Sequence, residues 1–301
     1  MNSETLHPSS VRSRWLDAES LQTLAELTKA RLNSLVLLTT AAGFYLGSKG
    51  AMDGWALARV LSGTGLLAGG AAVLNQYLER DYDARMTRTA HRPLPAGRIK
   101  PESAVLLGGI LSLAGLVYLA AEVNLLTAFL GAVTLITYLF IYTPLKRRTI
   151  WNTVVGAVPG ALPPVMGWVA AQGRLDWGAL AVFAILFFWQ VPHFLAIAWL
   201  YREDYARGGY VMLPVVDVDG SRTARHALHY TMAMMTASVL PSLLGLTGGL
   251  YLAGALVLGG LFLSATLWFA RRLHRPSARA LFLASILYQP VLVGLMVWDK
   301  V

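Results

Sequence analysis

The sequence predicts an all-α integral membrane protein, a bundle of nine transmembrane helices. Charged residues make up only 14% of the 301-residue chain, and the mean hydropathy is +0.54. A soluble globular domain is usually about a quarter charged, so this composition disfavours a soluble enzyme. The chain also contains no cysteine, which excludes disulfides, thiolate catalysis and iron–sulfur clusters.

Charge-free windows of the length needed for membrane spans support this fold class, because a bilayer requires about 20 apolar helical residues. The windows are 32–48, 60–78, 103–121, 123–145, 149–173, 177–201, 226–270 and 280–298. The window 226–270 would be about 67 Å long as one helix, so we expect it to fold back at Gly248-Gly249. The prediction is a single nine-helix domain over 28–301, after a polar cytoplasmic tail over 1–27 that is too acidic for a signal or transit peptide.

Lys and Arg are distributed unevenly between the two sets of predicted loops. Of the 25 basic residues, 21 fall on the side that carries the N-terminus. The positive-inside rule makes that side cytoplasmic and places the C-terminus on the opposite side. The sequence therefore predicts a multi-pass protein of the bacterial inner membrane with the lipid bilayer, and not nucleic acid, as the partner of its basic surface.

The candidate chemistry begins with three oxygen-bearing residues at the cytoplasmic end of the second span. Asn75, Glu79 and Asp83 are four residues apart and should share one helix face. Such oxygen donors suit Mg²⁺, which often shares its coordination with substrate phosphates. The competing interpretation is a set of ordinary interfacial charges that pair with Arg80 and Arg85.

A second acidic cluster follows the sixth span on the same side and contains Glu203, Asp204, Asp217 and Asp219. Basic residues that would complement a diphosphate lie between the two clusters, since arginine forks match phosphate oxygens. An apolar bundle with a metal–diphosphate site at its rim indicates an isoprenoid diphosphate substrate, whose charged leaving group the metal would neutralise.

Longer motifs carry a family resemblance. Asn75-x3-Glu79-x3-Asp83, followed by Arg88-Thr-Ala-His-Arg92-Pro-Leu-Pro-Ala-Gly97, resembles the first signature of the UbiA superfamily of membrane prenyltransferases. Three further stretches are similar to the branch of that superfamily that farnesylates haem: Tyr142-Thr-Pro-Leu-Lys146-Arg147, Trp189-Gln-Val-Pro-His193-Phe, and Tyr201-Arg-Glu-Asp204-Tyr-Ala-Arg-Gly208 closing with Met212-Leu-Pro-Val.

This resemblance implies a UbiA-type fold and an Mg²⁺-dependent reaction. Farnesyl diphosphate would ionise to an allylic cation, and the vinyl group of haem B would take up the farnesyl group with addition of water. The product, haem O, would serve terminal oxidases directly or after conversion to haem A. The resemblance also suggests haem A synthase or the terminal oxidase assembly as protein partners.

The resemblance further implies roles for particular residues. The catalytic and metal-binding set is Asn75, Glu79, Asp83 and Asp204, and Glu203 is a further candidate metal ligand. Candidate substrate-binding residues are Arg31, Arg80, Arg88, Arg92, Lys146, Arg147, His193, Tyr201 and Arg202. The sequence departs from the family pattern at Gln76, where many members have Asp, and at Leu200, where the second signature has an acid.

Three alternatives remain open at this stage. The acceptor could be an aromatic precursor of a quinone or a chlorophyll instead of haem. The bundle could also be a transporter, although transporters usually place their polar residues near the membrane midplane. Finally, His193 could contact haem, or it could hydrogen-bond a neighbour in the helix that Pro192 opens.

Overall fold

The computed structural model describes residues 18–301, so most of the predicted tail, including Arg12 and Arg14, lies outside the described residues. The long helices are α2 (Ala30–Gly47), α3 (Gly54–Asp83), α4 (Pro101–Glu122), α5 (Leu125–Ile136), α7 (Asn152–Gln172), α8 (Trp177–Leu200), α11 (Ser221–Leu243), α12 (Gly249–Arg272) and α13 (Arg275–Trp298). α5 continues through the π-helix η1 (Thr137–Tyr142) into α6 (Thr143–Leu145). The short helices are α1 (Ala18–Leu27), α9 (Arg202–Arg207) and α10 (Leu213–Val216).

The membrane-type helical fold that the sequence predicts is confirmed. Within residues 18–301, seven helical segments are long and apolar enough to cross a membrane: α3, α4, the continuous segment Leu125–Leu145, α7, α8, α12 and α13. α2 and α11 run beside them without reaching that hydropathy, and α11 carries Arg222 and Arg225 near its start. The structure therefore supports seven of the nine predicted spans by composition. The predicted fold-back is correct, because α11 ends at Leu243 and α12 begins at Gly249.

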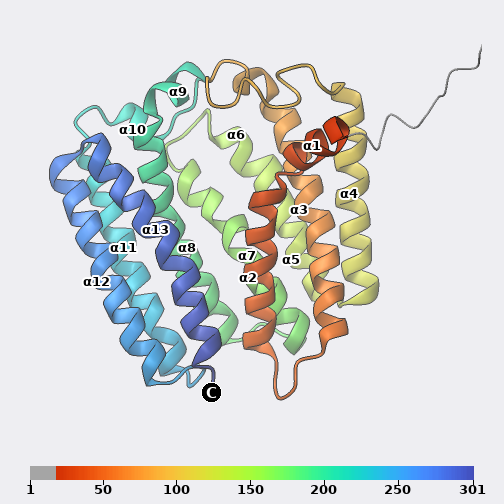
Figure 1. The fold of residues 1–301 in the computed structure, drawn as a ribbon, viewed down its shortest axis with the longest axis vertical. Helices are drawn as coiled ribbons and strands as arrows, with labels where there is room; N and C mark the ends of the chain where they lie inside the picture. The colour runs from red at the N-terminus through yellow and green to blue at the C-terminus, as the bar shows by residue number, and fades with distance from the viewer. Residues whose placement is uncertain (1–17) are drawn as a thin grey trace, which may run out of the picture.

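The helices form a closed bundle with its two ends clearly distinguished (Figure 1). α2, α3, α4, α5 and α7 pack in one half, α8, α11, α12 and α13 pack in the other, and α7–α8 and α13–α2 contacts join the halves. The short helices α1, α9 and α10 and the α3–α4 connection gather at one end, and the C-terminus lies at the other (Figure 1). Both acidic signatures are therefore at the same end of the bundle.

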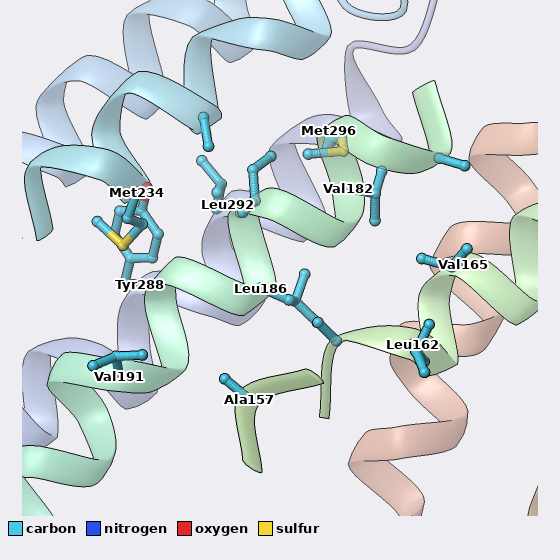
Figure 2. Packing of buried hydrophobic residues seen from close by; sticks show 14 of the residues in the cluster. Ala157, Leu162, Val165, Val182, Leu186, Val191, Met234, Tyr288, Leu292 and Met296 are labelled. Atoms are coloured by element: carbon cyan, nitrogen blue, oxygen red, sulfur yellow. The ribbon is translucent and has the colours of Figure 1, made fainter. Parts of the chain in front are cut away.

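The interior where the two halves meet is apolar. Figure 2 shows Leu186 of α8 near the middle of this packing, with Leu162 of α7 toward one side and Leu292 of α13 toward another. Met234 of α11 and Tyr288 of α13 extend the same cluster. Burying such side chains against one another gives rigid, well-packed contacts between helices.

Small residues let α2 and α7 approach closely. A Cβ atom added at Gly43 would lie 1.9 Å from the Pro164 carbonyl oxygen, and one at Gly167 would lie 1.9 Å from that of Thr40. Such contacts between helix backbones are typical of membrane bundles. Gly65 on α3 is different, because the nearest atoms to its added Cβ are methyl groups of Leu37 at 3.7 Å.

Two aspartates outside the two signatures cap the starts of long helices. The Asp53 carboxylate accepts hydrogen bonds from the backbone N–H groups of Trp55 (2.8 Å) and Ala56 (3.1 Å) at the start of α3. Asp176 caps α8 in the same way. These carboxylates satisfy N–H groups that have no partner inside the helix, so they stabilise helix ends.

Candidate active site

The stripe of oxygen donors predicted on α3 is present and buried. The residues Asn75, Glu79 and Asp83 are 1%, 5% and 1% exposed, whereas Asp81, between the last two, is exposed. The four-residue spacing places the three on one face, and that face points into the bundle. Their burial disfavours the interpretation as ordinary interfacial charges, at least for these three residues.

Asn75 is the centre of a hydrogen-bond network. Its Oδ1 atom accepts from the Lys29 Nζ atom (3.0 Å) and the Tyr138 hydroxyl (3.0 Å), and its Nδ2 atom donates to Thr143 Oγ1 (3.1 Å). Lys29 lies between α1 and α2 in a left-handed backbone conformation, with φ 49°. Burial, the largest cause, and the neighbouring Arg92 guanidinium together lower the pKa of Lys29 to about 7. The amide is therefore fixed by three partners from two separate segments of the chain, the α1–α2 connection and the α5–α6 segment.

The π-helix η1 brings two of these partners to Asn75. Pro144 has no backbone N–H and cannot donate to the carbonyl four residues earlier. One residue earlier, the N–H of Thr143 donates to the Tyr138 carbonyl five residues before it, which is the π-helical pattern. The Thr143 hydroxyl donates to that same oxygen at 2.8 Å. The wider turn places the Tyr138 hydroxyl and the Thr143 side chain against α3, consistent with the frequent occurrence of π-bulges at functional sites.

Each buried carboxylate of α3 is paired with a basic side chain. Lys146 Nζ lies 2.7 Å from Glu79 Oε1, and Arg92 Nη1 lies 2.6 Å from Asp83 Oδ2. Burial alone would lower the pKa of Lys146, but the attraction of Glu79, assisted by Tyr142 and Tyr138, raises it well above the ordinary value. Lys146 therefore stays protonated at neutral pH, and both buried carboxylates of α3 have a basic partner at this end of the bundle.

Asp204, in the second signature, connects α9 to the first signature. Its carboxylate accepts from the backbone N–H groups of Thr87 (3.1 Å) and Arg88 (3.2 Å) and from the Arg207 guanidinium. Burial raises the pKa of Asp204, but the Arg207 and backbone hydrogen bonds outweigh it and hold that pKa below the usual range. The two signatures thus meet through the α3–α4 connection.

The oxygen donors do not gather into one ready-made metal cluster. Across residues 18–301, no three Asp, Glu, His or Cys side chains lie close enough together to hold a metal ion. Asn75, Glu79 and Asp83 form one group and Asp204 a second, while Glu203 is exposed on α9. The donor chemistry fits a hard cation such as Mg²⁺, since every predicted ligand offers a carboxylate or amide oxygen.

Two members of the predicted second cluster have a structural role. Asp217 is buried, and its Oδ2 atom accepts from the Thr223 backbone N–H (2.7 Å) and hydroxyl (2.8 Å) at the start of α11. Asp219 similarly accepts from the N–H and hydroxyl of Ser221. Of the four acids in that cluster, Asp204 is the one that contacts the first signature.

We expect Asp217→Ala to reduce stability without changing catalysis. Loss of a helix-capping carboxylate costs about 1 kcal/mol, and the hydrogen bonds of Asp217 go to the start of α11 and not to the α3 stripe. Thermal melts in detergent and initial rates would separate the two effects. Asp219→Ala, at an exposed position, is the matched control and should change the melting temperature less. A large fall in kcat at unchanged stability would contradict the capping role.

Three of the predicted substrate-binding arginines lie over aromatic rings, and two others lie away from the site. The Arg88 guanidinium lies over the rings of Tyr201 (5.5 Å) and Tyr205 (5.6 Å), and that of Arg147 lies 4.3 Å from the Tyr82 ring centroid. Arg202 lies over Trp199. Two predicted residues are outside the site as the structure shows it: Arg80 pairs with Asp81, and Arg31 is exposed on α2.

His193 lies inside the bundle, between α8 and α13. Its ring stacks between Trp189 (5.1 Å between centroids) and Phe282 (5.4 Å), and its Nδ1 atom is 2.7 Å from Ser285 Oγ. This hydrogen bond joins His193 to α13 and not to a neighbour in α8 that Pro192 opens, and contact of His193 with haem stays a prediction. His193 is eight residues before Tyr201, about 12 Å along the helix from the charged end.

Sequence reasoning did not single out Lys29, Thr143 or Gln76 for these roles. Gln76 Nε2 donates to the carbonyls of Glu26 (3.0 Å) and Leu27 (2.7 Å), so it anchors the end of α1 where many family members carry an acid. The one available signal was the position of Lys29, a basic residue three positions before the start of the first apolar window. Nothing in the local pattern indicated that its ammonium turns inward.

The fold and this site define a class: a multi-pass helical membrane protein whose apolar bundle has buried acids and cations at one end. The UbiA prenyltransferase family matches residues 36–287, and the chain belongs to that family. Proteins named protoheme IX farnesyltransferase are similar over nearly the full length. The relative from Solibacter usitatus is 49% identical over 284 residues, covering 91% of this chain and 97% of the relative.

Other relatives and solved structures agree. The protoheme IX farnesyltransferase of Salinibacter ruber is 48% identical over 273 residues, covering 91% of this chain and 96% of the relative. A structure described as a digeranylgeranylglyceryl phosphate synthase shares the fold with a TM-score of 0.80 at 17% identity, covering 93% of this chain and 98% of that one. A UbiA homolog from Archaeoglobus fulgidus, bound to DMAPP and Mg²⁺, has a TM-score of 0.64 at 16% identity, covering 90% and 99%.

Proposed function

We propose that the protein transfers a farnesyl group from farnesyl diphosphate to a vinyl group of haem B and that water completes the product, haem O. The observation that carries this proposal is identity of 41–49% to proteins named protoheme IX farnesyltransferase, over more than nine-tenths of the chain. The buried polar end of an otherwise apolar bundle is consistent with a substrate that has a long apolar chain and a charged head.

The diphosphate head would bind at the α3 end of the bundle. Lys29, Arg92 and Lys146 bring three basic side chains to one buried face and would attract an anion there, and a bound anion would favour the protonated form of Lys29. Mg²⁺ held by Asn75, Glu79, Asp83 and Asp204, with Glu203 as a further candidate ligand, would supply neutralisation of the leaving group. When an anion enters, the basic side chains can exchange their carboxylate partners for phosphate oxygens.

The rest of the bundle would guide the reacting carbon. Apolar side chains of α2, α7, α8 and α13 surround the interior and would exclude water from the farnesyl chain. Cleavage of the allylic C–O bond leaves a farnesyl cation, and aromatic faces such as those of Tyr138 and Tyr142, stacked 5.9 Å apart, can stabilise it. The vinyl carbon then forms the new C–C bond, water adds hydroxyl to the resulting cation, and one proton is released.

We also propose the cellular setting that the charge distribution favours. The protein would be a multi-pass protein of the bacterial inner membrane, with a single domain over 28–301. The site would face the cytoplasm, because it lies at the end of the bundle with the basic loops and the positive-inside rule places such loops on the cytoplasmic side. Haem A synthase or the terminal oxidase assembly would receive the product, as the acceptor chemistry suggests.

A mass measurement tests the proposal directly. Membranes containing the protein, incubated with haem B, farnesyl diphosphate and Mg²⁺, should yield a haem whose mass has increased by one farnesyl group plus water. Parallel reactions would offer an aromatic carboxylic acid as acceptor. Prenylation of that acid and not of haem B, or uptake into liposomes without any covalent product, would contradict the proposed function.

A further inference from the structure

A continuous strip of aromatic rings joins α7, α8 and α11. The centroids of successive rings lie 5.3–6.3 Å apart. In order of contact, the members of this aromatic strip are Trp151 of α7, His226 and Tyr230 of α11, and Phe188, Phe187 and Phe183 of α8. The strip therefore crosses from the half of the bundle that contains α7 to the half that contains α8 and α11.

The aromatic strip faces away from the proposed active site. On α7, Gly156 faces the polar end, since a Cβ added there would lie 2.5 Å from the Tyr142 ring. Trp151 is five positions from Gly156 and so about 140° away around the helix axis, and it is 53% exposed. On α8, Leu180 lies seven positions before Phe187 on the same face and is 48% exposed. Both helices thus present the strip to the surroundings of the bundle.

The strip is also separate from the open cavity near α9. A cavity of about 590 Å³ lies where α8 meets α9, and Glu203, Asp204 and Arg275 are among its lining residues. Because the two acids are proposed metal ligands, this cavity belongs to the proposed diphosphate site. None of the rings of the aromatic strip lines it.

Three arginines without acidic partners stand at the polar end of the strip. Arg148 is three residues before Trp151 in the chain, and Arg222 is four residues before His226 on the same face of α11. Arg225 directly precedes His226. All three arginines are exposed, and none of them forms an ion pair with any residue among 18–301. Their guanidiniums are therefore available to an anion.

The depth of the strip matches one leaflet of a bilayer. Tyr230 lies nine residues after Ser221, or about 14 Å along α11 from the start of the helix. Half of a hydrocarbon core of about 30 Å is nearly the same length. A ligand that uses both features has a negatively charged head at the arginines and an apolar chain along the rings. A soluble anion would use the arginines and leave the rings without a role.

We propose that the aromatic strip, together with Arg148, Arg222 and Arg225, is a binding site for an anionic phospholipid. The phosphate lies among the guanidiniums, as in other basic sites between helices at a membrane surface. An acyl chain lies along Tyr230 and Phe188. Because the ligand contacts α7 and α11, which belong to different halves, it stabilises the folded bundle by binding to it.

Native mass spectrometry of the full chain tests the head-group preference. Released from detergent with equal amounts of phosphatidylglycerol and phosphatidylcholine, the protein should retain phosphatidylglycerol in preference. Arg222→Gln should weaken that binding about fivefold, the contribution of one arginine near an anionic lipid. Arg279→Gln is the matched control, because Arg279 is also exposed and without an ion pair in the described part of the chain. Equal retention of the two lipids, or an equal loss in both variants, would overturn the proposal.

A second comparison tests the role of the rings. Trp151→Ala should weaken retention of phosphatidylglycerol, whereas Trp177→Ala, at a 74% exposed position at the opposite end of α8, should leave it unchanged. Glycerol 3-phosphate carries the phosphate without acyl chains and should not displace the lipid at the same concentration. Displacement by it would assign the arginines to a soluble phosphate and contradict the lipid site.

Melting curves in detergent complete the test. Added phosphatidylglycerol should raise the melting temperature of the unmodified protein and of Arg279→Gln, and raise that of Arg222→Gln less. A second copy of the chain is the competing occupant of the strip. A dimer that forms without phosphatidylglycerol and that Trp151→Ala dissociates would replace the lipid by a protein interface. None of these measurements requires turnover, so their outcome is independent of the proposed function.

Discussion

Asp83→Ala should reduce turnover by at least about 100-fold while leaving the bundle folded. Asp83 is 1% exposed and pairs with Arg92 at 2.6 Å at the very end of α3, above the apolar core. Its loss removes one proposed metal ligand and frees a guanidinium that is partly exposed and can reach water. Initial rates of haem product formation, with size-exclusion profiles and melting curves, would measure both effects.

The control for Asp83 is two residues away on the same helix. Asp81 is exposed and pairs with Arg80 at a distance of 3.5 Å, so Asp81→Ala should keep its rate within twofold. Activity that persists in Asp83→Ala at saturating Mg²⁺ would remove Asp83 from the metal-binding set. A collapse of both variants in size exclusion would show instead that this helix end is needed for folding.

Gly43→Ala should cause a large loss of stability. The new Cβ would fall 1.9 Å from the Pro164 carbonyl oxygen, which belongs to a helix backbone and cannot rotate away. α2 and α7 must separate, and overpacking of this kind costs about 3 kcal/mol or more. The melting temperature in detergent should fall by roughly 6 °C or more.

Gly65→Ala is the matched control for that prediction. The site is also a helical glycine, but the nearest atoms to its added Cβ are Leu37 methyl groups at 3.7 Å, which is ordinary contact. Alanine also favours helix over glycine by about 1 kcal/mol. The variant should therefore be as stable as the unmodified protein or slightly more so. Equal melting temperatures for Gly43→Ala and the unmodified protein would show that α2 and α7 are not held by this contact.

The site shows which side-chain positions the spacing of residues in the sequence can predict and which it cannot. The spacing of Asn75, Glu79 and Asp83 was sufficient to place them on one face, because helix geometry is local. The acids after α8 could not be sorted in the same way. Asp204 and Asp217 are both aspartates in the connection between two long helices, yet one bonds the α3–α4 connection and the other caps α11. The distinction depends on which backbone N–H groups packing brings within reach.

The sequence by itself determined the helical membrane fold, the fold-back before α12 and the position of both signatures at one end. These follow from hydropathy, the length of a span and the distribution of Lys and Arg, which act over single helices and loops. Only the tertiary structure decided that Lys29 and Tyr138 meet Asn75, that Gln76 anchors α1, and that Arg275 shares a cavity with α9. Such contacts join residues far apart in the chain, and they are set by how whole helices pack.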